Sequence, residues 1–141
     1  MLFKVLSGLQ IAPSCWGFER VPLVVLMHGG GQTRQAWGTT GEILAAWGFN
    51  VIALDLRGHG DSDPHPNGEY GVTNYLKDLI AVLQEIDKPA ALVGASLGGL
   101  VAMTMADQID LKKFLVFQNY ILGKFLYHTI HSHSSHFLHI S

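Results

Sequence analysis

The sequence is poor in cysteine and in charge. Cys15 is its one cysteine, so no disulfide can form within the chain, and a reducing compartment, the cytoplasm, is the expected location. Charged residues make up 14% of the chain and the net charge is −2, which predicts no nucleic-acid partner. The apolar stretches before Cys15 are short and broken by polar residues, so we expect neither a signal peptide nor a membrane-spanning segment.

Apolar residues are plentiful, at 48% of 141 residues, and can form the core of one globular unit. Five runs are typical of strands: 8–12, 23–27, 50–54, 90–93 and 114–117. Helical spacing of apolar residues predicts helices over 33–47 and 72–86, the second ending before Pro89. This alternation predicts an α/β fold with a doubly wound, mostly parallel sheet, in which ligands bind beyond the carboxyl ends of the strands.

A serine lies between a predicted strand and a helical stretch. The pentapeptide from Gly94 to Gly98 has the pattern G-x-S-x-G, and small flanking residues are needed where a side chain projects from a tight strand-to-helix turn, a nucleophile elbow. Ser96 would then stand at the amino end of a helix, where backbone N–H groups face an anion formed on a substrate. The alternative is a glycine-rich turn with an incidental serine.

Three consecutive glycines follow the run 23–27. They belong to the segment HGGGQ, residues 28–32, and a loop of this kind can present main-chain N–H groups to a ligand. We assign one oxyanion donor to the N–H of Leu97 and the other to that of Gly30, with Gly31 as the alternative. A flexible loop needed only for chain reversal is the other interpretation.

The rest of this segment is expected to support the donors. We expect His28 to orient the loop by hydrogen bonding rather than to act as a base. Gly29 and Gly31 supply the freedom of the main chain that such a turn requires.

A polar loop over residues 55–62 follows the next buried strand. Its glycines allow backbone turns, and its polar side chains can satisfy its own main-chain groups. A metal site is the alternative, since carboxylates and imidazoles cluster here: Asp55, His59, Asp61 and His65. No spacing places these four on one rigid face, so we expect no metal and no other cofactor.

In order and spacing, residues 28–32, 55–62 and 94–98 together resemble the α/β-hydrolase fold enzymes, especially the esterase, haloperoxidase-like and C–C-hydrolase-like branch. The resemblance covers roughly residues 9–108. It implies that Ser96 is the nucleophile, that the HGGGQ turn is the oxyanion loop and that the substrate is a small molecule. Epoxide hydrolases and haloalkane dehalogenases of this family place an aspartate at the elbow, so a serine favours acyl transfer.

The resemblance also implies two residues that the sequence lacks. A serine hydrolase of this kind has a carboxylate and then a histidine after the serine. After Gln108 the one acidic residue is Asp110, which precedes the run 114–117 and would lie at the wrong edge of the sheet. We therefore expect a C-terminally truncated member of the family, without its triad acid and histidine.

The composition changes near the same position. Eleven alanines lie at or before Ala106 and none follows. Five of the eight histidines lie in the tail: His128, His131, His133, His136 and His139. We interpret residues 1–118 as the N-terminal portion of a hydrolase core and 119–141 as an irregular tail, foreign or out of frame. A metal-binding tract and a substitute catalytic base are the alternatives.

Two functions follow from these observations. The first is a serine hydrolase acting on a small ester or related carbonyl substrate, with the N–H groups of Gly30 and Leu97 stabilising the oxyanion. The second is a catalytically incompetent fragment or pseudo-enzyme. If later strands are missing, the run 114–117 becomes an unpaired apolar edge, through which we expect the chain to self-associate.

Overall fold

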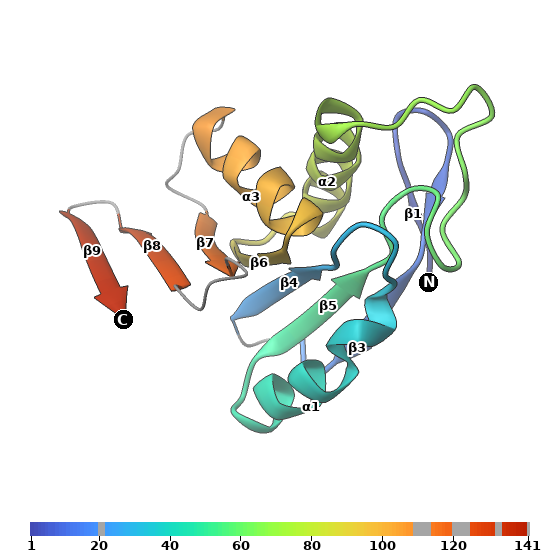
Figure 1. Ribbon diagram of the computed structural model, residues 1–141. Coiled ribbons are helices and arrows are strands. Elements are labelled where there is room, and N and C mark those ends of the chain that lie inside the picture. Colours follow the sequence, from blue (N-terminus) through green and yellow to red (C-terminus); the bar gives the residue numbers. More distant parts are fainter. Residues whose placement is uncertain (20–21, 109–113, 120–124, 132–133, 141) are drawn as a thin grey trace.

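A seven-stranded sheet with helices on both faces forms the body of the protein (Figure 1). The computed structural model describes residues 1–19, 22–108, 114–119, 125–131 and 134–140. In chain order its elements are β1 Phe3–Lys4, β2 Gln10–Ile11, β3 Pro13–Trp16, β4 Leu23–Met27, the 3-10 turn η1 Arg34–Trp37, α1 Gly38–Ala46, β5 Asn50–Leu54, α2 Val72–Ile86, β6 Ala90–Ala95, α3 Leu97–Gln108, β7 Phe114–Asn119, β8 Phe125–His131 and β9 Ser134–Ile140. The strand order is β3-β5-β4-β6-β7-β8-β9.

The centre of the sheet is parallel. β4 pairs in parallel with β5 on one side and with β6 on the other, and β6 pairs in parallel with β7. β4 and β5 begin and end where the sequence predicted, because strands buried on both faces are apolar over nearly their whole length. The predicted α/β fold with a doubly wound, mostly parallel sheet is confirmed.

Alternate residues of the central strands enter two separate apolar cores. Val25 of β4 belongs to the cluster that includes Leu79 of α2 and Val101 of α3. Val24 belongs to the cluster against which Leu44 of α1 packs. Figure 1 accordingly shows α2 and α3 on one face of the sheet and α1 on the other.

The direction of strand addition reverses at β4. From β4 the chain passes through α1 to β5 on one side, and then through α2 to β6 on the other side of β4. The segments that follow β4 and β6 therefore part toward opposite faces of the sheet. Ligands of open α/β sheets bind at such a point, beyond the carboxyl ends of the two strands.

The helix predicted over 72–86 is confirmed as α2. It ends where Asp87 adopts the left-handed conformation, two residues before Pro89. In the described part of the chain, no helix combines the length and the apolar character that crossing a bilayer requires.

Two predictions near the amino end are wrong in detail. The strand expected over 8–12 is limited to the two residues of β2, which pair with β1 outside the main sheet. The edge of the main sheet is β3, antiparallel to β5, and its first residue, Pro13, suits an edge strand. The helix expected over 33–47 begins as the turn η1, and Trp47 is 72% exposed rather than part of a buried face.

The C-terminal segment contains strands where an irregular tail was predicted. β8 pairs antiparallel with β7, and β9 pairs antiparallel with β8. The prediction that 114–117 forms an unpaired edge is therefore wrong, since β9 is the last strand on that side. Aromatic and β-branched residues favour strands even without regular alternation, which explains the error. The division into a core, 1–118, and a foreign tail, 119–141, stays a prediction.

Candidate active site

Ser96 is the single residue between β6 and α3. Its φ is +48°, in the left-handed region that residues with side chains seldom adopt, and the residue is exposed. Its carbonyl accepts the N–H of Leu100 at 2.9 Å, a bond of the first helical turn. The backbone makes a sharp strand-to-helix turn at this position, and the chemical role of the serine stays a prediction.

Gly94 and Gly98 have no room for side chains. A Cβ on Gly94 would lie under 3.0 Å from backbone atoms of Gly98 and Gly99. A Cβ on Gly98 would lie 2.6 Å from the carbonyl carbon of Met27 and 2.8 Å from the carbonyl oxygen of His28. The N–H of Gly98 also donates to that His28 oxygen at 3.2 Å. Glycine at both positions therefore allows α3 to begin directly against the ends of β4 and β6.

The loop after β4 folds back on itself. The N–H of Gly29 donates to Oε1 of Gln32 at 3.0 Å, and the N–H of Gln32 donates to the carbonyl of Gly29 at 3.1 Å. A Cβ on Gly30 would meet one atom within 4 Å, Cδ2 of Leu97 at 4.0 Å. Within the described part of the chain, the N–H groups of Gly30 and Leu97 have no acceptor. The two predicted oxyanion donors thus belong to neighbouring residues and are unpaired.

The surrounding hydrogen bonds distinguish Gly30 from Gly31. The carbonyl of Gly29 accepts the Nδ1–H of the buried His28 at 2.7 Å. Because the C=O and N–H of a trans peptide point in opposite directions, the N–H of Gly30 points away from His28. The N–H of Gly31 is already used, since it donates to Nε2 of His59 at 3.2 Å. Of the two glycines proposed as donors, Gly30 is therefore the one whose N–H is free among the described residues.

His28 is fully buried between two loops. Its Nε2 accepts the N–H of Leu56 at 3.0 Å, so both ring nitrogens have partners. Burial lowers the pKa of His28 and is the largest effect, and the hydrogen bond to Gly29 opposes it. The neighbouring His59 lowers this pKa further, and Asp55 raises it by the smallest effect of the four. His28 is thus neutral at neutral pH and connects the loops.

Arg34 connects the turn that follows residues 28–32 to the loop after β5. Its guanidinium pairs with the buried Asp55, and its backbone N–H donates to the same carboxylate at 2.6 Å. Its Nη2 donates to Asp61 at 2.8 Å, and its Nε donates to Ser14 on β3 at 2.9 Å. These carboxylates raise the pKa of Arg34, with Asp61 contributing most. The loop at 55–62 is therefore held by a cation that the sequence did not predict.

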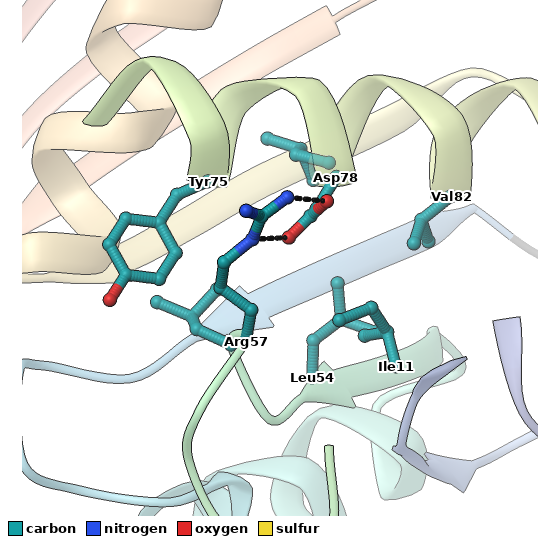
Figure 2. A pocket seen from close by; sticks show the side chains of 8 residues that line it. Ile11, Leu54, Arg57, Tyr75, Asp78 and Val82 are labelled. Carbon is teal, nitrogen blue, oxygen red and sulfur yellow. Dashed lines mark hydrogen bonds and ion pairs between the residues drawn. The ribbon is translucent and has the colours of Figure 1, made fainter. Parts of the chain in front are cut away.

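A second ion pair lies buried beneath α2. Nε and Nη2 of Arg57 donate to the two carboxylate oxygens of Asp78, each at 2.7 Å, and Figure 2 shows the pair beside Tyr75. Both residues line a cavity of about 10 Å³ together with apolar side chains such as Leu54. That space suffices for about one water molecule, so this cavity is not a substrate pocket. The sequence contains a signal for the pair, because Asp78 lies on the apolar face of α2, three residues after Tyr75. A carboxylate on a buried face needs a cationic partner.

The residues considered as a metal site have other partners. Asp55 and Asp61 bind Arg34, and Nε2 of His65 lies 3.5 Å from the carboxylate of Glu69. Among the residues that the structure describes, no group of three or more His, Cys, Asp or Glu side chains is placed to hold a metal ion.

No histidine with a described side chain is free to act as a base for Ser96. His28 and His59 each accept a backbone N–H on Nε2. Nδ1 of His65 faces two backbone N–H groups of its own loop. Asp110 and the side chains of the tail histidines lie outside the described residues.

Comparisons with known proteins give matches over most of the chain. Residues 24–127 match the family model for the alpha/beta hydrolase family. Esterase Rv0045c of Mycobacterium tuberculosis is 38% identical over 92 residues, which are 64% of this chain and 30% of that protein.

Solved structures agree. A thioesterase domain from the curacin biosynthetic pathway is 34% identical with a TM-score of 0.69, over 75% of this chain and 41% of that chain. Epoxide hydrolase A from Mycobacterium thermoresistibile is 30% identical with a TM-score of 0.68, over 75% of this chain and 34% of that chain. The chain therefore spans less than half the length of each of these proteins.

Proposed function

The chain belongs to the alpha/beta hydrolase family, and on this premise we propose that it supplies the nucleophile and the oxyanion hole of a serine hydrolase. Ser96 is the nucleophile, and the N–H groups of Gly30 and Leu97 are the oxyanion donors. The substrate is a small ester or a related carbonyl compound, in keeping with the esterase and thioesterase names of two relatives.

One observation carries the proposal: an exposed serine at φ +48° directly precedes Leu97, and the Leu97 side chain lies next to Gly30. The N–H groups of Leu97 and Gly30 have no acceptor in the described part of the chain. In the reaction, Oγ of Ser96 forms a bond to the carbonyl carbon while the carbonyl π electrons move onto oxygen. The two N–H groups donate to the resulting oxyanion, and removal of one such donor typically costs about 10²–10³ in kcat. The hydroxyl proton passes to a base that lies outside the described residues and from it to the leaving group, which departs as the oxyanion collapses. Water then cleaves the acyl–serine bond, which releases the acid and restores the Ser96 hydroxyl.

The alternative is a catalytically incompetent fragment or pseudo-enzyme. It is favoured because the described residues include no base that is free to accept the proton of Ser96. His28, His59 and His65 are all engaged elsewhere. In subtilisin, removal of the triad lowers kcat by about 10⁶-fold and leaves about 10³–10⁴-fold catalysis over water.

Labelling with a fluorophosphonate separates the two functions. The serine oxygen displaces fluoride from phosphorus, so a competent site gives one adduct on the peptide that contains Ser96, and Ser96→Ala gives none. A rate comparable with that of the esterase relative supports the serine hydrolase, and a rate no higher than that of Ser96→Ala supports the incompetent fragment. An adduct confined to another residue refutes Ser96 as the nucleophile.

Composition supports three proposals, on the location of the protein, on its partners and on its C-terminal tail. Its one cysteine supports a cytoplasmic location, and its net charge of −2 supports a partner that is not a nucleic acid. The loss of alanine after Ala106 supports a foreign or out-of-frame tail. Transcripts from independent samples that read residues 119–141 in frame would refute the last of these proposals.

A further inference from the structure

Two histidines connect the oxyanion loop and the loop after β5 in a reciprocal way. His28, at the end of β4, accepts on Nε2 the N–H of Leu56 in the other loop, at 3.0 Å. His59, in that other loop, accepts on Nε2 the N–H of Gly31, at 3.2 Å. The centroids of the two rings are 4.8 Å apart.

The hydrogen bonds define the protonation of both rings. Each Nε2 accepts an N–H and therefore carries no proton. Each Nδ1 faces a carbonyl oxygen, that of Gly29 at 2.7 Å for His28 and that of Arg57 at 3.0 Å for His59, and must therefore donate. Both imidazoles are neutral Nδ1–H tautomers in this arrangement.

Packing does not hold the glycines of the oxyanion loop. A Cβ on Gly31 would find nothing within 4 Å, and one on Gly30 would find a single leucine methyl group at 4.0 Å. Gly31 has φ +74°, and glycine populates positive and negative φ about equally, so the local sequence does not select this conformation. Within the described part of the chain, the bond from Gly31 to His59 is the one hydrogen bond made by these two glycines.

We propose that His28 and His59 form a reciprocal clasp between the two loops, and that His59 is a positioning residue that holds the Gly30–Gly31 segment with the Gly30 N–H facing the elbow. The clasp itself is argued from the contacts alone, whereas its effect on catalysis rests on the proposed function. His28 fixes the peptide before Gly30 through the Gly29 carbonyl, and His59 fixes the peptide after Gly30 through the Gly31 N–H.

Amide hydrogen exchange at Gly31, followed by NMR on the full chain, tests the clasp directly. His59→Phe removes the acceptor, and the Gly31 N–H is expected to exchange about three- to tenfold faster, the range for loss of one hydrogen bond. His59→Gln places an amide oxygen where Nε2 lies and is expected to restore the wild-type rate. His65→Phe is the matched control, since that ring interacts within its own loop, and it should leave Gly31 unchanged.

A measurement on the unmodified protein covers the case in which His59→Phe does not fold. The hydrogen bond joins the amide nitrogen of Gly31 to Nε2 of His59, so in ¹⁵N-labelled protein a scalar coupling between these two nitrogens is expected across the bond. Absence of that coupling, together with an unchanged exchange rate of Gly31 in His59→Phe, refutes the clasp, as does an equal effect of His65→Phe.

Fluorophosphonate labelling of Ser96 tests the effect on catalysis. The rate should fall by a similar three- to tenfold factor in His59→Phe and recover in His59→Gln. If Ser96 is unreactive even in the wild type, the proposed function fails while the exchange result still decides on the clasp. If labelling proceeds unchanged while Gly31 exchange accelerates, His59 holds the loop without positioning the donor, and that part of the proposal is overturned.

Discussion

Replacement of Gly98 by alanine is expected to lower the free energy of unfolding by about 2 kcal/mol. The new Cβ would lie 2.6 Å from the carbonyl carbon of Met27 and 2.8 Å from the carbonyl oxygen of His28, whereas ordinary contacts are 3.4–4 Å. Both obstacles are main-chain atoms at the end of a central strand, so α3 has to move. Overpacking of this kind costs about 1–3 kcal/mol. The lost hydrogen bond from Gly98 adds about 1 kcal/mol, and the preference of helices for alanine over glycine offsets about 1 kcal/mol.

Gly38→Ala is the matched control. It makes the same change at the start of α1, at φ −50° and with no atom within 4 Å of the new Cβ, so a gain of about 0.5–1 kcal/mol is expected. Urea unfolding of both variants beside the wild type, at a common m-value, measures the difference. If Gly98→Ala is as stable as the wild type, the result contradicts the close approach of the start of α3 to the end of β4.

Three further predictions concern stability and assembly. Asp78→Ala should cost about 3–5 kcal/mol in urea unfolding because it leaves the buried Arg57 unpaired, whereas Lys77→Ala, an exposed neighbour, should stay within about 0.5 kcal/mol of the wild type. The lowered pKa of His28 means that the unfolded chain binds a proton more tightly than the folded chain does. The contribution of His28 to the free energy of unfolding is therefore fully present above pH 6.5. It decreases as the pH falls toward the folded-state pKa, by at most about 1.4 kcal/mol per pH unit. Urea unfolding over this pH range should show the slope, and an equal slope in His28→Gln would contradict it. The purified chain should self-associate in size-exclusion chromatography with light scattering, through the β9 edge, and a sharp monomer peak with a cooperative melt would contradict this.

The central strands could be predicted from the sequence because burial on both faces leaves a direct trace in it. β4 and β5 are unbroken or nearly unbroken apolar runs. β3 leaves no such trace, since Pro13–Trp16 mixes proline, serine and cysteine on the edge of the sheet. Its register against β5 depends on contacts with residues about forty positions away, which local periodicity does not contain.

The start of α1 shows how a glycine can mislead. Gly41 has a low helix propensity, yet it is the buried residue of α1. Glycine is needed there because the Trp16 ring packs so close that a Cβ would lie 2.6 Å from it. The helical spacing that predicted this element came from four residues: Trp37, Ile43, Leu44 and Trp47. Trp37 and Leu44 do pack against the core, whereas Ile43 and Trp47 are 46% and 72% exposed. Packing of the Trp16 ring against a bare backbone has no signature in hydrophobic spacing.

The candidate site divides in the same way. The strand-to-helix turn at Ser96 could be predicted because a tight turn requires small residues on both sides of it. The bond from His59 to Gly31 and the bonds of Arg34 to Asp55 could not, because each joins loops that follow different strands. Their partners are known only once the strand order is known.

The conformation of Ser96 limits which residues could stand in its place. Among residues with side chains, aspartate and asparagine tolerate the left-handed region best and β-branched residues such as threonine worst. The chain itself holds Asp87 at φ +49° where α2 ends, within one degree of the φ of Ser96. An aspartate at the elbow would therefore suit the backbone at least as well as the serine does. Under the proposed function, one substitution on such a turn can therefore exchange a nucleophile suited to carbonyls for one suited to epoxides while the sheet stays intact. Threonine is disfavoured at the position by its backbone conformation rather than by its hydroxyl.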